Sequence, residues 1–213
     1  MNIGIIGSGN VGRALGKGFV SRGHSVHLGT RDPNREELQQ WASEGGDNAT
    51  VSTNEDAAAF GELIVLATDW SGTENAIQLA GVSNFSGKVV IDVTNPLDFS
   101  QGGAALAIGH TDSAGEQIQR WLPDAYVVKA FNSVTAALMV DPDISGGPPT
   151  MFIAGDHPAA RSRVTEICRD FGWEVVDIGP MTGARYLEPL AMVYIVHAFD
   201  TGNWMQAFKL LKK

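Results

Sequence analysis

Short apolar runs alternate with amphipathic stretches along most of the 213-residue chain. Runs such as LIVLA and KVVIDV are apolar at nearly every position, which is typical of strands in a sheet that is covered on both faces. The apolar runs predict strands at residues 3–6, 26–28, 50–52, 63–67, 89–93, 126–129, 151–154 and 174–178. The stretches between them predict helices at residues 11–21, 35–43, 55–60, 72–79, 113–121 and 158–171.

Strands that alternate with helices indicate βαβ units and a parallel sheet. We therefore expect an α/β fold of the Rossmann type, with a doubly wound, mostly parallel sheet and a small helical C-terminal portion. Residues 1–180 would form the sheet domain, and residues 181–213 the C-terminal helical segment. The Gly/Pro cluster SGGPP at residues 145–149 is expected to be a loop rather than a domain linker.

The C-terminal segment is apolar on two sides of its predicted helix. One stripe at helical spacing consists of Leu187, Leu190, Ala191, Tyr194, Ile195 and Ala198. The opposite face carries Met192, Val193, Val196 and Phe199. A helix that is apolar all round must be buried on every side. Because a chain of this size offers little to cover it, we expect a homodimer whose interface uses this helix. His197 is expected to be a core residue rather than a base.

Composition narrows the possible functions. The 15 basic and 24 acidic residues give a net charge of −9, which argues against binding nucleic acid or another polyanion. No apolar run approaches the ~20 residues of a membrane-spanning helix. The single cysteine, Cys168, has the helical spacing of a core residue, and the five histidines lack the spacing of a metal site. We expect a cytoplasmic protein without metal, membrane or nucleic-acid partners.

The stretch IGIIGSGNVGRALG contains a G-x-G-x-x-G motif between a predicted strand and a predicted helix. In this context Gly7 permits a tight turn, Gly9 lets the backbone approach a pyrophosphate, and Gly12 lets helix and strand pack closely. The helix N-terminus then faces the phosphates. The motif predicts a dinucleotide site formed by Gly7, Ser8, Gly9, Asn10, Val11 and Gly12.

The end of the second predicted strand, in VHLGTRDPNR, indicates which dinucleotide is bound. A site that prefers NAD usually carries an acidic residue here for the ribose 2′-hydroxyl. Asp32 precedes Pro33, which suits a helix N-cap and turns the carboxylate toward its own helix. Thr30, Arg31 and Arg35 can instead bind a 2′-phosphate. We therefore expect NADP rather than NAD.

Ligands of a doubly wound sheet lie beyond the carboxyl ends of its strands. Three such ends read LATDW, DVTNP and VKAFNSV. We expect the nicotinamide pocket to be lined by Thr68, Trp70, Asn95, Pro96 and Asn132, and the cofactor also to contact Ala67. The same ends carry Asp69, Thr94, Lys129 and Ser133. Alternatively, Asp69 caps the next helix, Trp70 packs against it, and Asn95–Pro96 is a turn.

No catalytic residue is assigned from the sequence. The chain has no G-x-S-x-G elbow and no Cys/His pairing typical of a nucleophile. If the protein is an enzyme, bound cofactors carry the chemistry and the protein aligns them.

Taken together, these motifs resemble the family of coenzyme F420-dependent NADP oxidoreductases. They are also similar to the NADPH-binding domain of the six-transmembrane metalloreductases. The similarity runs through IGIIGSGNVGRALGKGF, GHSVHLGTRDP, IVLATDW, DVTNP, VVKAFNSV and DIGPMTGARYLEPL. Its more specific parts are the GTR strand end and the D-x-G-x-x-x-x-A/S-R-x-x-E stretch from Asp177 to Glu188.

The resemblance implies a dimeric Rossmann protein that transfers hydride between NADP(H) and a stacked deazaflavin or flavin ring, with F420, FMN or FAD as the second substrate. Asn132 departs from the pattern, because the deazaflavin enzymes carry a histidine there. Two alternatives stay open. One is an imine or short hydroxy-acid reductase completed by a partner chain. The other is an NADP-binding sensor without turnover.

Overall fold

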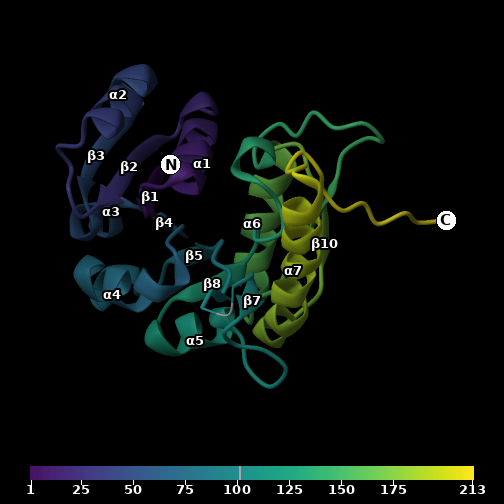
Figure 1. Ribbon diagram of the computed structural model, residues 1–213. Coiled ribbons are helices and arrows are strands. Elements are labelled where there is room, and N and C mark those ends of the chain that lie inside the picture. Colours follow the sequence, from purple (N-terminus) through teal and green to yellow (C-terminus); the bar gives the residue numbers. More distant parts are fainter. Residues whose placement is uncertain (101) are drawn as a thin grey trace.

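The computed structural model describes residues 1–100 and 102–213 (Figure 1). Six strands form a parallel sheet in the order β3-β2-β1-β4-β5-β8. Their bounds are β1 Asn2–Ile6, β2 Ser25–Thr30, β3 Ala49–Thr53, β4 Leu63–Leu66, β5 Val89–Asp92 and β8 Tyr126–Lys129. The order reverses direction between β1 and β4, which is the switch point of a doubly wound sheet. The predicted Rossmann-type fold is confirmed.

Helices cover both faces of this sheet. Their bounds are α1 Asn10–Ser21, α2 Glu36–Gly45, α3 Asn54–Phe60, α4 Trp70–Ala80, α5 Ala114–Trp121, α6 Pro158–Asp170 and α7 Ala184–Thr201. One apolar cluster joins the sheet to α1, α2 and α6. A second cluster joins the opposite face to α3, α4 and α5. Strands β4 and β5 contribute to both clusters, which explains why their sequences are apolar at consecutive positions.

Two further strands, β9 (Thr150–Ile153) and β10 (Glu174–Asp177), pair in parallel and form a separate two-stranded sheet. An antiparallel bridge between Lys129 and Ala154 joins β8 to β9, with N–H···O distances of 2.8 and 3.2 Å. The sequence pattern predicted β9 and β10 but missed a short hairpin of β6 (Leu97–Asp98) and β7 (Ala105–Leu106). Strands of two residues are too short to show a period.

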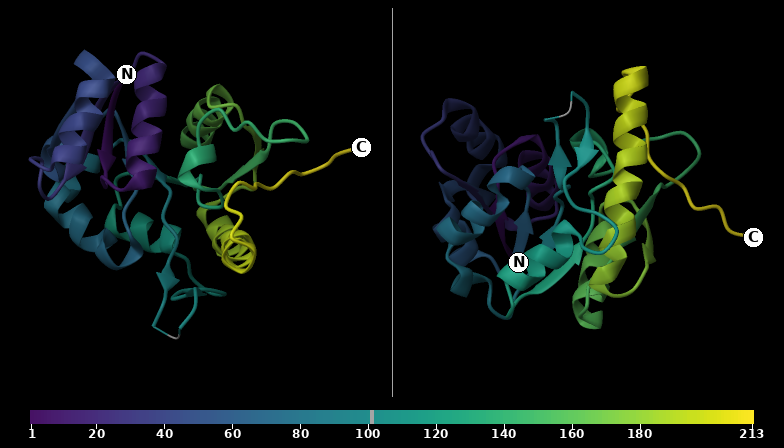
Figure 2. Two further views of the ribbon diagram at one scale, coloured as in Figure 1. Left: turned by 45° about the horizontal axis from the view of Figure 1, so that its top comes forward. Right: turned by 60° about the horizontal axis from the view of Figure 1, so that its bottom comes forward.

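The C-terminal segment is only partly helical, which corrects the expectation for residues 181–213. After a short 3₁₀ turn at Met181–Gly183, α7 ends at Thr201, because Gly202 takes a left-handed conformation with φ of +70°. Residues 202–213 have no helical turn. They pass beside β9, where the carbonyl of Phe208 accepts the N–H of Thr150 at 2.8 Å, and the end of the chain then projects from the body (Figure 2).

Helix α7 buries the predicted stripe against the rest of the chain. Leu187, Ala191 and Ala198 are buried in this face. Val193, Val196 and Phe199 on the other face are 61%, 53% and 59% exposed. His197 is exposed and contacts Gln206 at 2.7 Å, so the expectation of a core histidine is wrong. In the sequence it lies between the buried residues Ile195 and Ala198, but its side chain is on the exposed side of α7. Cys168 is buried as expected, and burial raises the pKa of its thiol.

Candidate functional site

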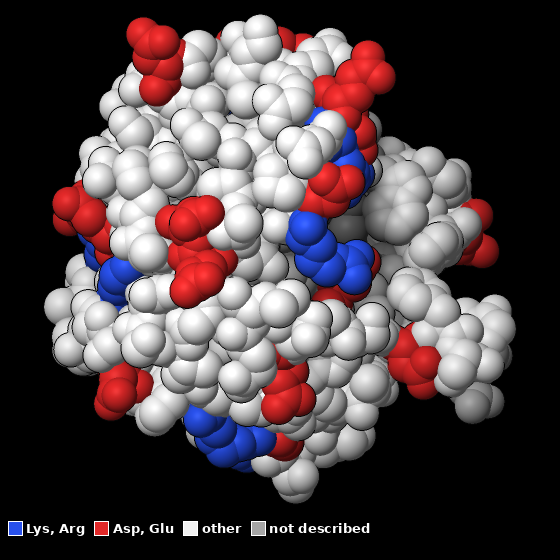
Figure 3. Space-filling model, turned by 90° about the vertical axis from the view of Figure 1, so that its left-hand side faces the viewer, with Lys and Arg blue, Asp and Glu red and all other residues white. Residues whose placement is uncertain are grey.

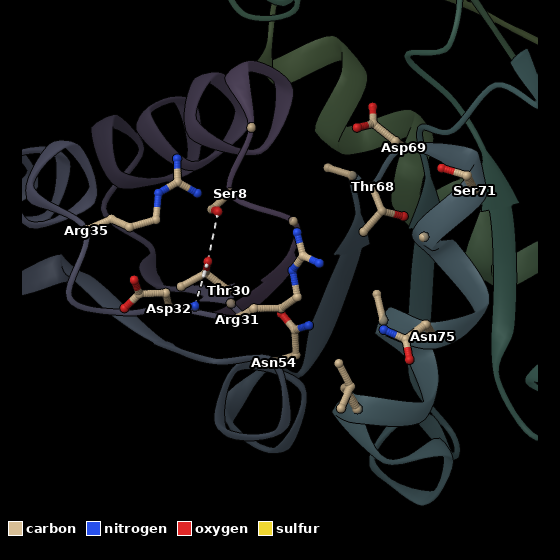
Figure 4. Close-up of a pocket in the computed structure, with 17 residues that line it drawn as sticks. Ser8, Thr30, Arg31, Asp32, Arg35, Asn54, Thr68, Asp69, Ser71 and Asn75 are labelled. Carbon is tan, nitrogen blue, oxygen red and sulfur yellow. Dashed lines mark hydrogen bonds between the residues drawn. The ribbon is translucent and has the colours of Figure 1, made fainter. Parts of the chain in front are cut away.

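A cavity of about 1030 Å³ lies beyond the carboxyl ends of β1, β2 and β4 (Figure 4). Its floor is the turn between β1 and α1, one wall is the end of β2, and the opposite wall is the start of α4. Of the residues predicted to bind cofactor, those that line it are Gly7, Ser8, Gly9, Thr30, Arg31, Arg35, Ala67 and Thr68. Asn10, Val11, Gly12 and Asn95 do not line it.

The three motif glycines occupy different environments. Gly7 has φ of +117°, and a Cβ there would collide with the carbonyl oxygen of Ala67. A Cβ at Gly12 would collide with the carbonyl oxygen of Gly7, because α1 packs directly on the turn. A Cβ at Gly9 would meet nothing within 4 Å. Gly9 is also the N-cap of α1, and no described side chain caps the helix. Open space therefore lies beside uncapped N–H groups that can bind an anion.

The two remaining residues of this motif face other parts of the protein. Asn10 Oδ1 accepts a hydrogen bond from Arg13 at 2.8 Å, and Val11 packs against the core cluster under α1. Their predicted contacts with the cofactor would therefore involve backbone atoms at the start of α1.

The end of β2 presents a hydroxyl and two arginines to the cavity. Thr30 is held by Ser8, whose hydroxyl donates to Thr30 Oγ1 at 3.1 Å. The side chain of Arg31 extends into the cavity (Figure 4) and has no hydrogen-bond or ion-pair partner among the described residues. The guanidinium of Arg35 lies closer to Ser8 and is bonded to Glu37. Of the two arginines, Arg31 is therefore the one whose charge is available to a ligand.

Asp32 also lines the cavity, but it does not cap α2 as predicted. Helix α2 begins at Glu36 with Arg35 as its N-cap. The Oδ1 atom of Asp32 accepts the N–H of Asn34 at 3.0 Å and closes a turn before the helix. The carboxylate is therefore bonded within the loop before the helix and not to the helix itself, because α2 starts later than Pro33.

Asn54 is a cavity residue that the sequence analysis missed. It follows β3 as the first residue of α3, and its buried Oδ1 atom has no hydrogen-bond partner among the described residues. A buried polar atom without a partner is rare in a folded protein, and at the wall of a cavity such an atom is free to accept a hydrogen bond from a ligand. The rule that placed ligands at strand ends could have identified Asn54, had it been applied to the third strand. Ser71 and Asn75 of α4 form the facing wall.

These observations fit a dinucleotide with an additional phosphate on its ribose. The open space at Gly9 admits a pyrophosphate, Arg31 offers an unpaired cation, and Asn54 offers an unsatisfied acceptor. On the face over α2 and α4 the basic side chains form small groups, one of them at the edge of a hollow (Figure 3). A local group of this kind suits a phosphate better than a polyanion.

Asn95 and Asn132 meet beyond the ends of β5 and β8, outside this cavity. Asn95 Nδ2 donates to the carbonyl of Asn132 at 2.6 Å, and Asn132 Nδ2 donates to Asn95 Oδ1 at 3.1 Å. Asn132 Nδ2 also donates to the carbonyl of Leu187 in α7 at 2.9 Å. Pro96 is buried beside this pair. These side chains, predicted to line one pocket, are indeed neighbours.

The strand end of β4 carries three further residues of the predicted pocket, of which Thr68 and Asp69 line the cavity and Trp70 does not. Trp70 stacks on Trp121 with ring centroids 5.5 Å apart, and so packs against α5 instead of lining the cavity. Thr68 Oγ1 lies 2.8 Å from Thr73 Oγ1 at the start of α4. Asp69 is the N-cap of α4 by position, but its side chain makes no capping bond.

Lys129 is fully buried and does not line the cavity described above. Its ammonium lies 2.7 Å from Asp92 Oδ2, 2.9 Å from Glu188 Oε1 and 2.8 Å from the carbonyl oxygen of Thr94. The contact between Lys129 Nζ and Asp92 Oδ2 is an ion pair, and its angles do not meet those of a hydrogen bond. Burial alone would lower the pKa of Lys129, but the two carboxylates outweigh it and hold this pKa above its usual value. Lys129 is therefore charged, which removes it as a proton acceptor.

No group of three or more His, Cys, Asp or Glu side chains in residues 1–100 and 102–213 could hold a metal ion. Within the same residues, no helix has both the length and the apolar character that a bilayer crossing requires.

Comparison with known proteins identifies relatives. The sequence model of the family described as "NADP oxidoreductase coenzyme F420-dependent" matches residues 2–96. Metalloreductase STEAP3 of Rattus norvegicus is 31% identical over 191 residues, which are 89% of this chain. The chain spans only 36% of the length of that metalloreductase. The F420-dependent NADP reductase of Methanothermobacter marburgensis is 29% identical over 208 residues, with 92% of this chain and 91% of the relative covered.

A solved structure from Arthrobacter sp. FB24, described as a candidate F420-dependent NADP-reductase, superposes with a TM-score of 0.94. It is 38% identical, and the match covers 100% of both chains. A reductive aminase from Aspergillus terreus superposes with a TM-score of 0.66 at 17% identity, which shows a shared fold only. The end-to-end match at 38% identity, together with the family model, shows that this chain belongs to the family of coenzyme F420-dependent NADP oxidoreductases.

Proposed function

We propose that the protein binds NADP(H) and exchanges hydride between its nicotinamide and a deazaflavin or flavin ring stacked upon it. The observation that carries this proposal is the cavity in which the open space at Gly9 and the unpaired Arg31 lie at adjacent strand ends. Because the Asp32 carboxylate is bonded within its own turn, Arg31 rather than Asp32 would contact the 2′-position of the ribose.

In this proposal the chain's own residues bind and orient the cofactor. The N–H groups at the start of α1 would hold the pyrophosphate, while Thr30 and Arg31, supported by Arg35, would hold the 2′-phosphate. The nicotinamide supplies the hydride chemistry when bound. The protein's contribution is to hold two rings about 3–3.5 Å apart, a task that requires no protein nucleophile.

The second substrate follows from the relatives' names and is part of the proposal. A relative covered over most of its length is an F420-dependent NADP reductase, and F420 is therefore the first candidate. Asn132 leaves flavin as a second candidate, because the deazaflavin enzymes resembled here carry a histidine at this position. A reductase of imines or hydroxy acids is a weaker alternative, since the solved imine reductases share only the fold. We also propose a cytoplasmic homodimer joined through the exposed face of α7.

A stopped-flow experiment tests the proposed function. Purified protein loaded with NADPH is mixed separately with F420, FMN, FAD and buffer, and NADPH absorbance is followed. Oxidation with F420 alone would establish the deazaflavin reaction, and oxidation with FMN or FAD would establish flavin reduction. Tight NADPH binding without oxidation by any of the three would overturn the proposal and favour a sensor or a different substrate.

A further inference from the structure

Asp92, Lys129 and Glu188 form a buried ion cluster that the cofactor cavity does not include. They come from β5, β8 and α7, and each side chain is at most 1% exposed. The three groups carry a net charge of −1 when ionised. The N–H groups of Ala114 and Gly115 offset it, because they donate to the two oxygens of Glu188 at 3.0 and 3.1 Å from the start of α5. Burying these charges costs free energy. Removing one member of the cluster costs more, because it leaves a buried charge without its partner.

The ion cluster determines the position of the loop after β5. The Lys129 ammonium donates to the carbonyl of Thr94, and the Oδ1 atom of Asp92 accepts from both the N–H and the hydroxyl of Thr94, at 2.9 and 2.7 Å. Thr94 is thus held on both sides by members of the cluster. The next residue is Asn95, whose side chain is paired with Asn132.

The loop after β8 is tied to the same helix. Asn132 Nδ2 bonds the carbonyl of Leu187, the residue next to Glu188 in α7. Phe131, just before Asn132, has φ of +59°, a left-handed conformation that is unfavourable for a buried aromatic residue. Such strain persists only where surrounding contacts determine the backbone, and it concentrates at functional sites. Helix α7 thus holds both loops. Glu188 acts through Lys129 on the loop after β5, and Leu187 bonds the loop after β8 directly.

The strand order places these loops next to the cavity. The sheet runs β2-β1-β4-β5-β8, all parallel, so the carboxyl ends lie along one edge about 4.8 Å apart. The cavity occupies the ends of β2, β1 and β4. A dinucleotide with its 2′-phosphate at β2 and its pyrophosphate at β1 would place its nicotinamide near β4 and β5. The Asn95–Asn132 pair lies beyond the ends of β5 and β8, beside that part of the sheet edge.

From this arrangement we propose that Glu188 is a positioning residue for the nicotinamide end of the site and acts through Lys129 on the Thr94–Asn95 loop. The inference rests on the proposed binding of NADP(H). It gives a role to the D-x-G-x-x-x-x-A/S-R-x-x-E stretch, whose last residue is Glu188. Helix α7 is then part of the cofactor site although it contributes no residue to the cavity.

Substitution of Glu188 by Gln tests this role. The carboxylate accepts hydrogen bonds from two backbone N–H groups and pairs with the Lys129 ammonium, while a carboxamide is uncharged and directs an NH₂ group toward one of these partners. Arg185→Gln is the matched control, because Arg185 bonds Glu116 at 2.6 and 2.8 Å and also ties α7 to α5, without touching Lys129. Isothermal titration calorimetry with NADPH and with 2′,5′-ADP, a fragment lacking the nicotinamide, separates the two ends of the site.

We expect Glu188→Gln to weaken NADPH binding about tenfold and to leave 2′,5′-ADP within about twofold. Arg185→Gln should leave both affinities unchanged. Hydride transfer to the active acceptor should slow about 10- to 100-fold in Glu188→Gln, since small misplacements reduce rates strongly. Equal losses for both ligands, or no loss for either, would overturn the proposal. The affinity ratio remains informative even if no acceptor oxidises NADPH, so failure of the proposed reaction is distinguishable.

A measurement on the unsubstituted protein covers the case in which Glu188→Gln does not fold. Hydrogen–deuterium exchange is followed in the presence of saturating NADPH or 2′,5′-ADP. We expect NADPH, but not 2′,5′-ADP, to slow exchange in two places. One is the start of α5, where the amides of Ala114 and Gly115 bond Glu188, and the other is the first turns of α7. Equal exchange with the two ligands at these amides would overturn the coupling.

Discussion

At the scale of single residues, Arg31 offers a direct test of cofactor choice. Its guanidinium projects into the cavity without a partner in residues 1–100 and 102–213, so a bound 2′-phosphate would gain a charged hydrogen bond. We expect Arg31→Ala to weaken NADPH binding by about 1.5–3 kcal/mol and to leave NADH nearly unchanged. Equal losses for NADPH and NADH in a fluorescence titration would show that Arg31 does not contact the 2′-phosphate. Arg35→Ala, whose guanidinium is already bonded to Glu37, should have the smaller effect.

Gly9 and Gly12 should respond to alanine in opposite ways. At Gly9 the backbone has φ of −72° and a methyl group meets nothing, so Gly9→Ala should keep or raise stability, by up to about 1 kcal/mol. The methyl group fills the space beside the α1 N–H groups and should weaken NADPH binding. At Gly12 the methyl group meets the backbone of Gly7, so Gly12→Ala should destabilise by about 1–3 kcal/mol or more. Urea unfolding and NADPH titration of both variants check this contrast.

At the scale of elements, a pH-dependent contact joins Arg120, in the last turn of α5, to Asp112, which lies just before that helix. The Arg120 guanidinium bonds Asp112 at 2.7 Å and lowers the pKa of that carboxyl to about 2. Because the folded-state pKa lies below the unfolded value, this stabilisation is present above about pH 4 and is lost as the pH falls toward 2. Arg120 is largely exposed, so the contribution should not exceed about 1 kcal/mol. Between pH 5 and pH 3, Asp112→Asn should lose less unfolding free energy than the parent protein; equal losses would exclude this contact as a cause.

Elements with a strong period were predictable from the sequence, and those held by distant contacts were not. Strand β4 is apolar throughout because both faces are covered, and each predicted βα unit was found. The hairpin of β6 and β7 has two-residue strands without a period. The antiparallel bridge at Ala154 depends on a neighbour brought together only by folding. Pro33 suggested a helix start at that residue. Instead, the Asp32 carboxylate closes a turn at Asn34, and α2 begins only at Glu36.

At the scale of the whole molecule, the adenosine half of the site is local in sequence and the nicotinamide half is not. The glycine motif and the β2 end each follow a strand directly, so motif spacing locates Gly9 and Arg31. Lys129 was identified only as a strand-end residue, and its partners Asp92 and Glu188 lie 37 and 59 positions away in the chain. Spacing cannot predict an ion cluster assembled from three separated elements. This cluster is one of the contacts that tie the C-terminal helix to the sheet.

The exposed face of α7 leads to a prediction about assembly. Val193, Val196 and Phe199 leave a row of apolar side chains in water on a helix whose other face is packed. If this row is a dimer contact, light scattering should give a mass of about twice 22.6 kDa. Val196→Glu would bury an unpaired charge in that contact and should give the single-chain mass without unfolding the protein. Ser162→Glu adds the same charge on the exposed side of α6 and should leave the mass unchanged. A single-chain mass for the parent protein would exclude this apolar face as a dimer contact.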